Sequence, residues 1–507
     1  MAILNKLISK LTSKRLEQID YFRKNPFEVQ QQTFINLINE ANNTIWGKKF
    51  AYNEIKNFND YELFTNRVPI SSYNELKPFI DRVRSGEQNV LWSSEIKWFA
   101  KSSGTTADKS KFIPVSNEAL EFCHFRGGRD VLVLYSEMFP ETNIFKGRAL
   151  GVGGSQQISN MDNDMYYGDL SAVLIENLPF WADFLRTPSK NIALHPEWEE
   201  KIEQMAKITS KQNVTNISGV PSWTLVLLKK ILEITGKNNI SEVWENLELF
   251  VHGGVSFVPY FEEYKRFISS QSMRYMETYN ASEGFFSIQD DLSSDDMLLM
   301  LDYGIFYEFI RLEDVEQSSP KIYTLMEVEL KTNYAIITST NGGLWRYLIG
   351  DTIIFTSKKP FKIKITGRTK HFINAFGEEV IIDNAETALK IACEKTNSSI
   401  SEYTAAPLYM SEKAQGSHQW LIEFSKLPNN LEEFVQILDN ELKSVNSDYE
   451  AKRYKGISLK MPELIVARKN LFYEWLKNNG KLGGQHKVPR LNNNRIFIDQ
   501  LLEMNNL

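Results

Sequence analysis

The pattern of apolar and polar positions divides the chain into regions of different character. Residues 1–65 carry Leu, Ile and Phe at spacings near three or four among Gln, Asn and Lys, which predicts packed helices. From about 90 to 355, short β-like runs alternate with helical runs such as 222–234, which follows the turn 219–221. This alternation predicts an α/β domain, because each strand needs a helix to cover its apolar face.

The β-like runs have two patterns. Some are short and apolar, as buried strands are: 149–152, 249–252 and 335–338. Segment 322–338 instead alternates apolar and polar residues, which indicates strands of a mixed or barrel-like sheet.

A change in composition near residue 367 predicts a domain boundary. The chain becomes basic over 356–371. The part that follows has helix patterns of its own at 384–395 and 431–445, and an apolar strand at 419–424. We therefore expect two domains, 1–367 and 368–507, and we find no internal repeat or low-complexity tract.

Composition excludes several classes of protein. The 507 residues include 58 Lys and Arg against 64 Asp and Glu, a net charge of −6, which disfavours a protein that binds nucleic acid through a basic surface. The two cysteines and six histidines form no CxxC, HxxxH or HExxH spacing, so neither a disulfide framework nor a zinc site is expected. No run of 18 apolar residues occurs and the N-terminus lacks the apolar core of a signal peptide, so a cytoplasmic location is expected.

The strongest chemical signal is segment 101–114, which packs hydroxyls, a glycine and lysines into a short run. Backbone N–H and side-chain O–H groups of such a segment can wrap a polyphosphate, and lysine adds a point charge for the β and γ phosphates. It is not a Walker loop, because GxxxxGK[ST] occurs nowhere in the chain. Taken alone, the segment fits a polar surface loop between two strands equally well.

Two further segments carry carboxylates beside glycines. Segment 278–284 offers an aromatic ring and Glu283 just before a glycine, and a carboxylate there can hold Mg²⁺ near a triphosphate. Segment 342–351 ends in Asp351, and an ionised carboxylate can accept both hydroxyls of a ribose. Taken alone, the first is better explained as a strand end with a turn, and the second as a hairpin with Asp351 in its turn.

Two basic segments come later. Segment 366–380 lies where the composition changes, which makes it a candidate hinge. The glycine-rich segment 483–490 presents Lys487, which can deliver a positive charge to a site elsewhere. A solvated basic loop is the alternative for both segments.

In this order and at this spacing, the five segments resemble the adenylate-forming superfamily. Within it they resemble the bacterial form of the auxin-responsive Gretchen Hagen family of acyl acid amido synthetases. The resemblance covers nearly the whole chain, and includes 68–73 and 86–92 before the phosphate segment. It implies an α/β fold, with a large N-terminal adenylate-forming domain that has β-sheets and a barrel-like part. It also implies a small mobile C-terminal α+β domain with a hinge near 368–371.

The resemblance also implies roles for single residues. Lys487, Lys111 and Glu283 match catalytic groups; Lys487 would reach the α-phosphate and the acyl carboxylate, and Glu283 would also hold Mg²⁺. Lys370 occupies the hinge position, where many members have aspartate, and His486 replaces the usual tyrosine before Lys487. The positions that match ATP-binding residues are Ser102, Ser103, Gly104, Thr105, Thr106, Gly253, Gly254, Val255, Thr278, Tyr279, Ser282, Asp351 and Arg368.

The residues of the acyl pocket are the hardest to identify from the sequence. Arg126 and Arg129, on the predicted helix 118–136, offer charge to an acidic group, although surface ion pairing is the commoner role of such residues. Trp223 and Phe285 offer apolar walls, although aromatic residues at such positions more often belong to the core.

The implied function is ATP-dependent synthesis of an amide. A carboxylic acid would be activated as acyl-AMP with release of pyrophosphate, and the acyl group would pass to an amine, for which an amino acid is expected. ATP and Mg²⁺ are the expected cofactors, and neither nucleic acid nor a membrane is an expected partner. An acyl-CoA ligase of the aryl-acid type shares the first half reaction and is the main alternative; a nucleotide-binding protein without catalysis is another.

Overall fold

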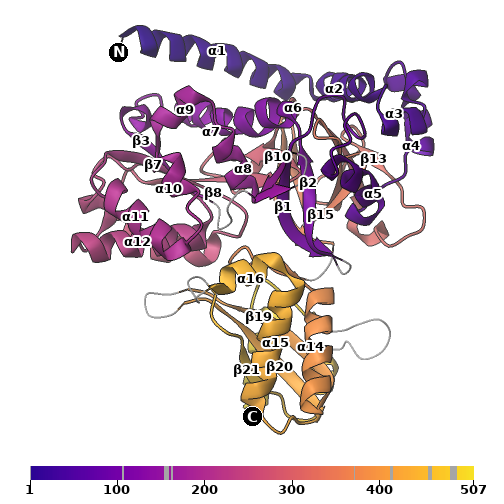
Figure 1. The fold of residues 1–507 in the computed structure, drawn as a ribbon, viewed down its shortest axis with the longest axis vertical. Helices are drawn as coiled ribbons and strands as arrows, with labels where there is room; N and C mark the ends of the chain where they lie inside the picture. Colours follow the sequence, from indigo (N-terminus) through magenta and orange to yellow (C-terminus); the bar gives the residue numbers. More distant parts are fainter. Residues whose placement is uncertain are drawn as a thin grey trace.

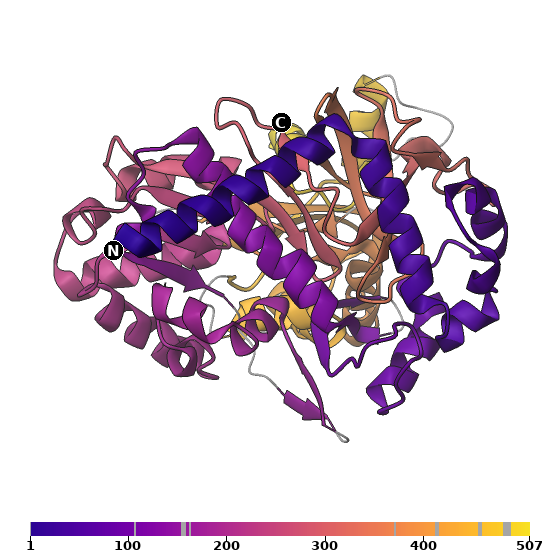
Figure 2. The same cartoon turned by 90° about the horizontal axis from the view of Figure 1, so that it is seen from above.

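The computed structural model describes residues 2–105, 108–153, 159–161, 164–369, 372–410, 415–454, 459–479 and 488–506. Helices predicted over residues 1–65 are present, and α1 crosses the top of the large domain (Figures 1 and 2). Ser72 caps the helix that follows them, and the Glu75 carboxylate accepts the Ser72 backbone N–H at 2.7 Å, which is the pairing of a capping box. The first helices are α1 (Ala2–Lys24), α2 (Pro26–Ala41), α3 (Ile45–Lys49), α4 (Tyr61–Arg67) and α5 (Tyr73–Arg84).

One large sheet forms the centre of the N-terminal domain. In the described chain it has twelve strands, in the order β13-β12-β14-β15-β16-β11-β10-β9-β8-β7-β3-β6. From β9 to β6 neighbouring strands are parallel, and from β9 to β13 they are antiparallel. The strands are β3 (Arg148–Val152), β6 (Arg186–Thr187), β7 (Val214–Gly219), β8 (Leu249–His252), β9 (Arg274–Ala281), β10 (Gly284–Ile288), β11 (Met297–Leu299), β12 (Ile305–Arg311), β13 (Tyr323–Thr324), β14 (Asn333–Thr340), β15 (Tyr347–Lys358) and β16 (Phe361–Arg368).

The strands predicted to form a barrel-like part are the antiparallel half of this sheet. Among the described strands they do not close on themselves, because β16 pairs with β11 and so continues the sheet toward its parallel half. The alternating segment 322–338 contributes β13 and most of β14, with turns and an isolated bridge of Leu330 to Phe355 between the two strands.

A smaller sheet carries the predicted phosphate segment. In the described chain its strand order is β2-β1-β5-β4, and β1 pairs with β2 as an antiparallel hairpin. The segment is therefore two paired strands with a short connection rather than a long loop, and Ser102 lies opposite Lys111. The strands are β1 (Trp98–Thr105), β2 (Asp108–Val115), β4 (Ser159–Met161) and β5 (Met165–Gly168).

Helices cover the parallel half of the large sheet (Figure 1). The predicted helix 222–234 is α12, which begins at Pro221 and ends at Gly236 in the left-handed conformation that glycine permits. Its buried Leu228 and Ile231 belong to one apolar cluster with Ile217 of β7. The helices of this region are α6 (Asn117–Ala119), α7 (Phe125–Met138), α8 (Leu170–Glu176), α9 (Phe180–Leu185), α10 (Lys190–Ala193), α11 (Trp198–Thr209), α12 (Pro221–Thr235) and α13 (Phe261–Phe267), with a π-helical turn at Leu120–His124.

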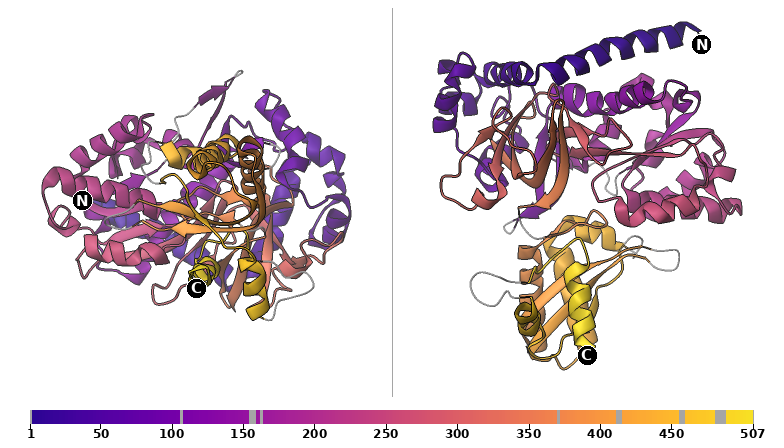
Figure 3. Two further views of the ribbon diagram at one scale, coloured as in Figure 1. Left: turned by 90° about the horizontal axis from the view of Figure 1, so that it is seen from below. Right: turned by 180° about the vertical axis from the view of Figure 1, so that it is seen from behind.

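The C-terminal part forms a separate domain below the large one (Figures 1 and 3). It holds the predicted helices as α14 and α15 and the predicted strand as β20, which pairs with β19 and β21. Strand β16 ends at Arg368, beside the boundary that the sequence predicts; the division at residue 367 stays a prediction. The elements are β17 (Phe372–Ile373), β18 (Val380–Ile381), β19 (Ser399–Leu408), β20 (Ser417–Lys426), β21 (Glu463–Val466), α14 (Ile382–Thr396), α15 (Leu431–Val445), α16 (Ser447–Arg453), α17 (Leu471–Asn478) and α18 (Ile496–Asn505).

A search of the described helices for one that could cross a bilayer finds none of sufficient length and apolar character.

Candidate active site

The centre of the candidate site is a hydrogen-bonded trio from three strands. Asp351 on β15 accepts a hydrogen bond from the Tyr279 hydroxyl at 2.6 Å and another from Arg368 Nε at 2.7 Å. Asp351 and Arg368 are direct partners across β15 and β16, and Tyr279 reaches them from β9. Asp351 therefore lies inside a strand rather than in the hairpin turn that its segment suggested, and its carboxylate is held by both neighbours.

Arg368 also connects this trio to the C-terminal domain. Its Nη1 lies 3.2 Å from Oε2 of Glu379, which lies near the end of the candidate hinge segment 366–380. Burial lowers the pKa of Arg368, but the carboxylates of Glu379 and Asp351 raise it more, so the guanidinium remains charged. The ion pair joins the two sides of the domain junction.

Glu283 occupies the turn between β9 and β10, beside the trio. Burial raises the pKa of its carboxyl group, and the negative charge of Asp351 raises it further. Lys111 on β2 acts in the opposite direction, because its positive charge lowers this pKa. The phosphate hairpin and the β9–β10 turn thus meet at one place.

The other predicted phosphate-binding residues lie along the same hairpin. Ser102 is half-buried on β1, directly opposite Lys111. Ser103, Gly104 and Thr105 continue β1, whereas Thr106 lies outside the described residues. Lys370 and Lys487, predicted as hinge residue and catalytic lysine, and His486 beside the latter, also lie outside the described residues.

The segment 252–255 forms the carboxyl end of β8 and the turn after it. A Cβ on Gly253 would lie 2.4 Å from the Thr278 carbonyl oxygen, so the two chains approach closely, and the Thr278 hydroxyl donates to the His252 carbonyl at 3.2 Å. Gly254 has φ +80°, a conformation that suits glycine. Val255 is buried, and Ser282 is half-buried in the turn beside Glu283.

His252 is buried and its ring stacks on Phe257 at a centroid distance of 4.1 Å. Burial lowers its pKa to about 3, so the imidazole is neutral at ordinary pH. A neutral imidazole brings no positive charge to this part of the candidate site.

The close approach at Gly253 predicts a strong effect of a single methyl group. Gly253→Ala places its Cβ against Thr278, so the strand end must shift, and we expect the KM for ATP to rise about tenfold or more. Gly151→Ala is the matched control on β3, where an added Cβ meets no other described atom within 4 Å. Steady-state kinetics of both variants test this, and an unchanged KM in Gly253→Ala would contradict the assignment.

Two of the residues predicted for the acyl pocket, Arg126 and Arg129, have hydrogen-bond partners in the large domain. Arg126 donates to the Asp302 carbonyl at 2.9 Å and Arg129 to the Glu121 carbonyl at 3.3 Å, so both guanidinium groups bind within the domain. A role for either arginine in an acyl pocket stays a prediction.

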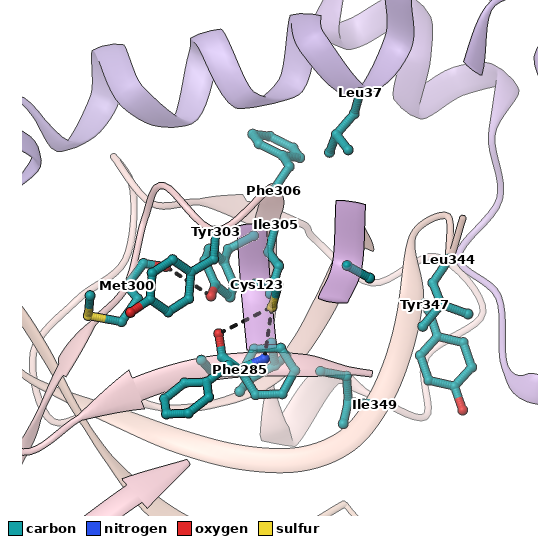
Figure 4. Packing of buried hydrophobic residues seen from close by; sticks show 14 of the residues in the cluster. Leu37, Cys123, Phe285, Met300, Tyr303, Ile305, Phe306, Leu344, Tyr347 and Ile349 are labelled. Carbon is teal, nitrogen blue, oxygen red and sulfur yellow. Dashed lines mark hydrogen bonds between the residues drawn. The ribbon is translucent and has the colours of Figure 1, made fainter. Parts of the chain in front are cut away.

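Phe285 lies in the core of the large domain. Figure 4 shows Cys123 against it, with the thiol sulfur 3.1 Å from the Phe285 backbone nitrogen. Phe285 is 5% exposed, and a Cβ on Gly127 of α7 would lie 2.4 Å from its ring. Trp223, at the start of α12, is 7% exposed. A place for either ring in an acyl pocket stays a prediction.

Sequence reasoning missed Glu379. The residue lies within the candidate hinge segment, but nothing in that pattern distinguishes it from its neighbour Glu378. The structure distinguishes them: Glu378 is fully buried and accepts the backbone N–H groups of Ala375 and Phe376, whereas Glu379 has φ +39° and turns toward Arg368. Only the fold reveals which carboxylate faces the site.

Comparison with known proteins identifies the family. Models of the GH3 family N-terminal, central and C-terminal domains match residues 15–273, 298–368 and 383–496. The chain belongs to the GH3 family. This confirms the resemblance to the Gretchen Hagen amido synthetases that the ordered motifs indicate.

Two GH3 relatives from one plant match it over nearly their full length. Indole-3-acetic acid-amido synthetase GH3.3 of Arabidopsis thaliana is 23% identical, over 94% of this chain and 91% of the relative. The 4-substituted benzoates-glutamate ligase GH3.12 of the same plant is 22% identical, over 94% of each. The solved structure of the AtGH3.15 acyl acid amido synthetase in complex with 2,4-DB has a TM-score of 0.62 and 16% identity, over 97% of this chain and 96% of that one. The α/β fold of this chain is the GH3 fold.

Proposed function

We propose that this chain is an acyl acid amido synthetase that uses ATP. It joins a carboxylic acid to an amine, with an amino acid as the acceptor. The observation that carries the proposal is the meeting of Tyr279, Asp351 and Arg368 with Glu283 and Lys111 at one place. Named GH3 relatives with this activity, matched over nearly their whole length, support it.

Asp351 is proposed to hold the ribose of ATP. An ionised carboxylate only accepts hydrogen bonds, and the two ribose hydroxyls are donors. Tyr279 and Arg368 fix the direction of the carboxylate, so little ordering is needed when the nucleotide binds. The edge formed by 253–255 and Thr278 would lie along the adenine.

The phosphates are proposed to lie between the β1–β2 hairpin and Glu283. Lys111 brings a positive charge, and Ser102, Ser103, Gly104, Thr105 and Thr106 supply hydroxyl and backbone donors. In the described chain, no group of three or more His, Cys, Asp or Glu side chains suits a metal ion. Glu283 nevertheless fits Mg²⁺, because this ion commonly uses one carboxylate together with substrate phosphates. When bound, Mg²⁺ would neutralise charge on the phosphates.

In the first half reaction, an oxygen of the acid attacks the α-phosphorus. The new P–O bond forms as the bond to the pyrophosphate oxygen breaks, and acyl-AMP and pyrophosphate result. The protein supplies position and charge rather than covalent chemistry. Lys487 would neutralise charge at the α-phosphate and the acyl carboxylate.

In the second half reaction, the amine nitrogen attacks the acyl carbon. The C–O bond to AMP breaks, the nitrogen loses its proton, and amide and AMP leave. The C-terminal domain would rotate about 368–371 between the two steps, which would withdraw Lys487 and open a path for the amine. The ion pair of Arg368 with Glu379 spans this junction, so its geometry would change in the rotation.

Pyrophosphate exchange tests the proposal. The enzyme is incubated with ATP, labelled pyrophosphate and a panel of carboxylic acids, and label should enter ATP only when a suitable acid is present. The best acid is then tested for AMP release with amino acids and with coenzyme A. Amide formation with an amino acid supports the proposal; thioester formation alone would favour the acyl-CoA ligase, and no acid-dependent exchange would leave only nucleotide binding.

A further inference from the structure

A loop of the C-terminal domain contacts the large domain beside the candidate nucleotide site. It covers residues 374–379, between β17 and β18, and we call it the junction loop. At its start, Asn374 Nδ2 donates to the Gly254 carbonyl at 3.2 Å, and the Tyr260 hydroxyl donates to the Ala375 carbonyl at 2.6 Å. Gly254 belongs to the segment that is proposed to lie along the adenine. The start of the loop therefore contacts the adenine side of the site.

The end of the junction loop contacts the ribose side of the site. Glu379 Oε2 lies 3.2 Å from Arg368 Nη1, and Arg368 Nε donates to Asp351 at 2.7 Å. Asp351 is the carboxylate that is proposed to hold the ribose. One loop thus contacts the two parts of the site that would bind the nucleoside of ATP.

A buried pair of side chains sets the conformation of the junction loop. Glu378 is 0% exposed and His418 of β20 is 1% exposed, and His418 Nε2 lies 2.8 Å from Glu378 Oε1. An ionised carboxylate only accepts hydrogen bonds, so Nε2 is the donor. The same carboxylate accepts the backbone N–H groups of Ala375 and Phe376, at 3.1 and 2.6 Å. Glu378 therefore folds back and closes the loop on itself.

The side chains around the pair pack the junction loop closely. Phe376 is 0% exposed, and a Cβ on Gly416 would lie 2.2 Å from its ring. The His418 ring stacks with that of Phe376 at a centroid distance of 6.5 Å. Without the donor of His418, a buried carboxylate would lack one of its partners, and the loop would have to move to satisfy it.

We propose that His418 and Glu378 are positioning residues for nucleotide binding. In the part of the chain that the structure describes, the hydrogen bonds of these two side chains lie within the C-terminal domain. The pair acts on the site through the junction loop, which contacts Gly254 at its start and Arg368 at its end. This inference rests on the proposed function, which supplies the roles of the adenine and ribose segments.

Calorimetric titration of AMP into the full-length enzyme tests the inference. His418→Leu removes the donor to Glu378 but keeps a side chain of similar size, and we expect the Kd for AMP to rise about tenfold. His418→Gln supplies a side-chain NH₂ donor in place of Nε2 and should restore most of the affinity. A wild-type Kd in His418→Leu would overturn the inference.

The same titration separates positioning from a purely structural role. If His418 only stabilised the fold, its replacement would lower the number of binding sites per chain and leave the Kd of the folded enzyme unchanged. Phe434→Leu is the matched control in the core of the same domain, where Phe434 of α15 lies 5.3 Å from Phe424 of β20 between ring centroids. It should lower the unfolding temperature without changing the Kd for AMP.

A substitution in the junction loop tests the route of the effect and does not require a core variant to fold. Asn374→Ala removes the donor to the Gly254 carbonyl, and we expect the Kd for AMP to rise about threefold to tenfold. Because His418 is proposed to act through this loop, the variant with both His418→Leu and Asn374→Ala should lose less affinity than the product of the two single losses. Wild-type affinity in Asn374→Ala, or losses that multiply fully, would contradict this route.

The outcomes also separate this inference from the proposed function. If the wild type binds AMP and shows acid-dependent pyrophosphate exchange, unchanged Kd values in the variants would overturn this inference alone. If the wild type binds no AMP, the nucleotide site on which both proposals rest is wrong.

Discussion

Lys487→Ala is expected to slow the adenylation half reaction by about 10²–10³. The rate of the amide-forming half reaction should stay close to that of the wild type. The lysine would neutralise charge on the α-phosphate and on the attacking carboxylate. The two groups carry this charge together only while acyl-AMP is being formed. Acid-dependent pyrophosphate exchange measures the first half reaction. The second is measured by supplying synthetic acyl-adenylate and an amino acid, and following the amide.

The control for this asymmetry is Lys477→Ala, an exposed lysine of α17 that precedes the same segment. It should leave both half reactions close to the wild-type rates. If Lys487→Ala slowed both half reactions equally, the result would contradict the role given to this lysine. It would also contradict the domain rotation that is proposed to withdraw it.

Glu283→Gln is expected to reduce acid-dependent pyrophosphate exchange by about 10²–10³ at saturating ATP and Mg²⁺. The substitution keeps the size and hydrogen-bonding capacity of the side chain but removes the charge that faces Lys111. A neutral amide is a poorer partner for a hard cation than a carboxylate, so the apparent Mg²⁺ requirement should also rise.

Glu277→Gln provides the matched control. Glu277 lies on the same strand that leads to Glu283, and burial raises the pKa of its carboxyl too, but the charges that act on it are those of Asp295 and Lys364. Exchange should remain near wild type in this variant. Similar activity in both variants would show that the charge of Glu283 is not needed for adenylation.

Elements with a strong local pattern could be predicted from the sequence. Helix α15 spans the predicted 431–445, and helix α14 contains the predicted 384–395. Other features depend on distant partners: the open antiparallel half follows from the pairing of β11 with β16, and local alternation cannot distinguish it from a barrel-like sheet.

The candidate site shows the same limit. Ordered motifs and their resemblance to a family identified Tyr279, Asp351 and Arg368, and the fold brings these three into hydrogen-bonding contact. Glu379 could not be identified in this way, because its ion pair with Arg368 depends on the position of the C-terminal domain against the large one. The partners of Arg126 and Arg129 likewise depend on backbone carbonyls that no sequence pattern reveals.

The central claim is that one acid becomes covalently attached to AMP before the amide forms. The most direct measurement uses a carboxylic acid labelled with oxygen-18 in its carboxylate, with ATP, Mg²⁺ and an amino acid, followed by mass spectrometry of the products. Attack on the α-phosphorus predicts that each AMP released during amide formation carries one heavy oxygen from the acid. Unlabelled AMP, or ADP with the heavy oxygen in inorganic phosphate, would contradict the account.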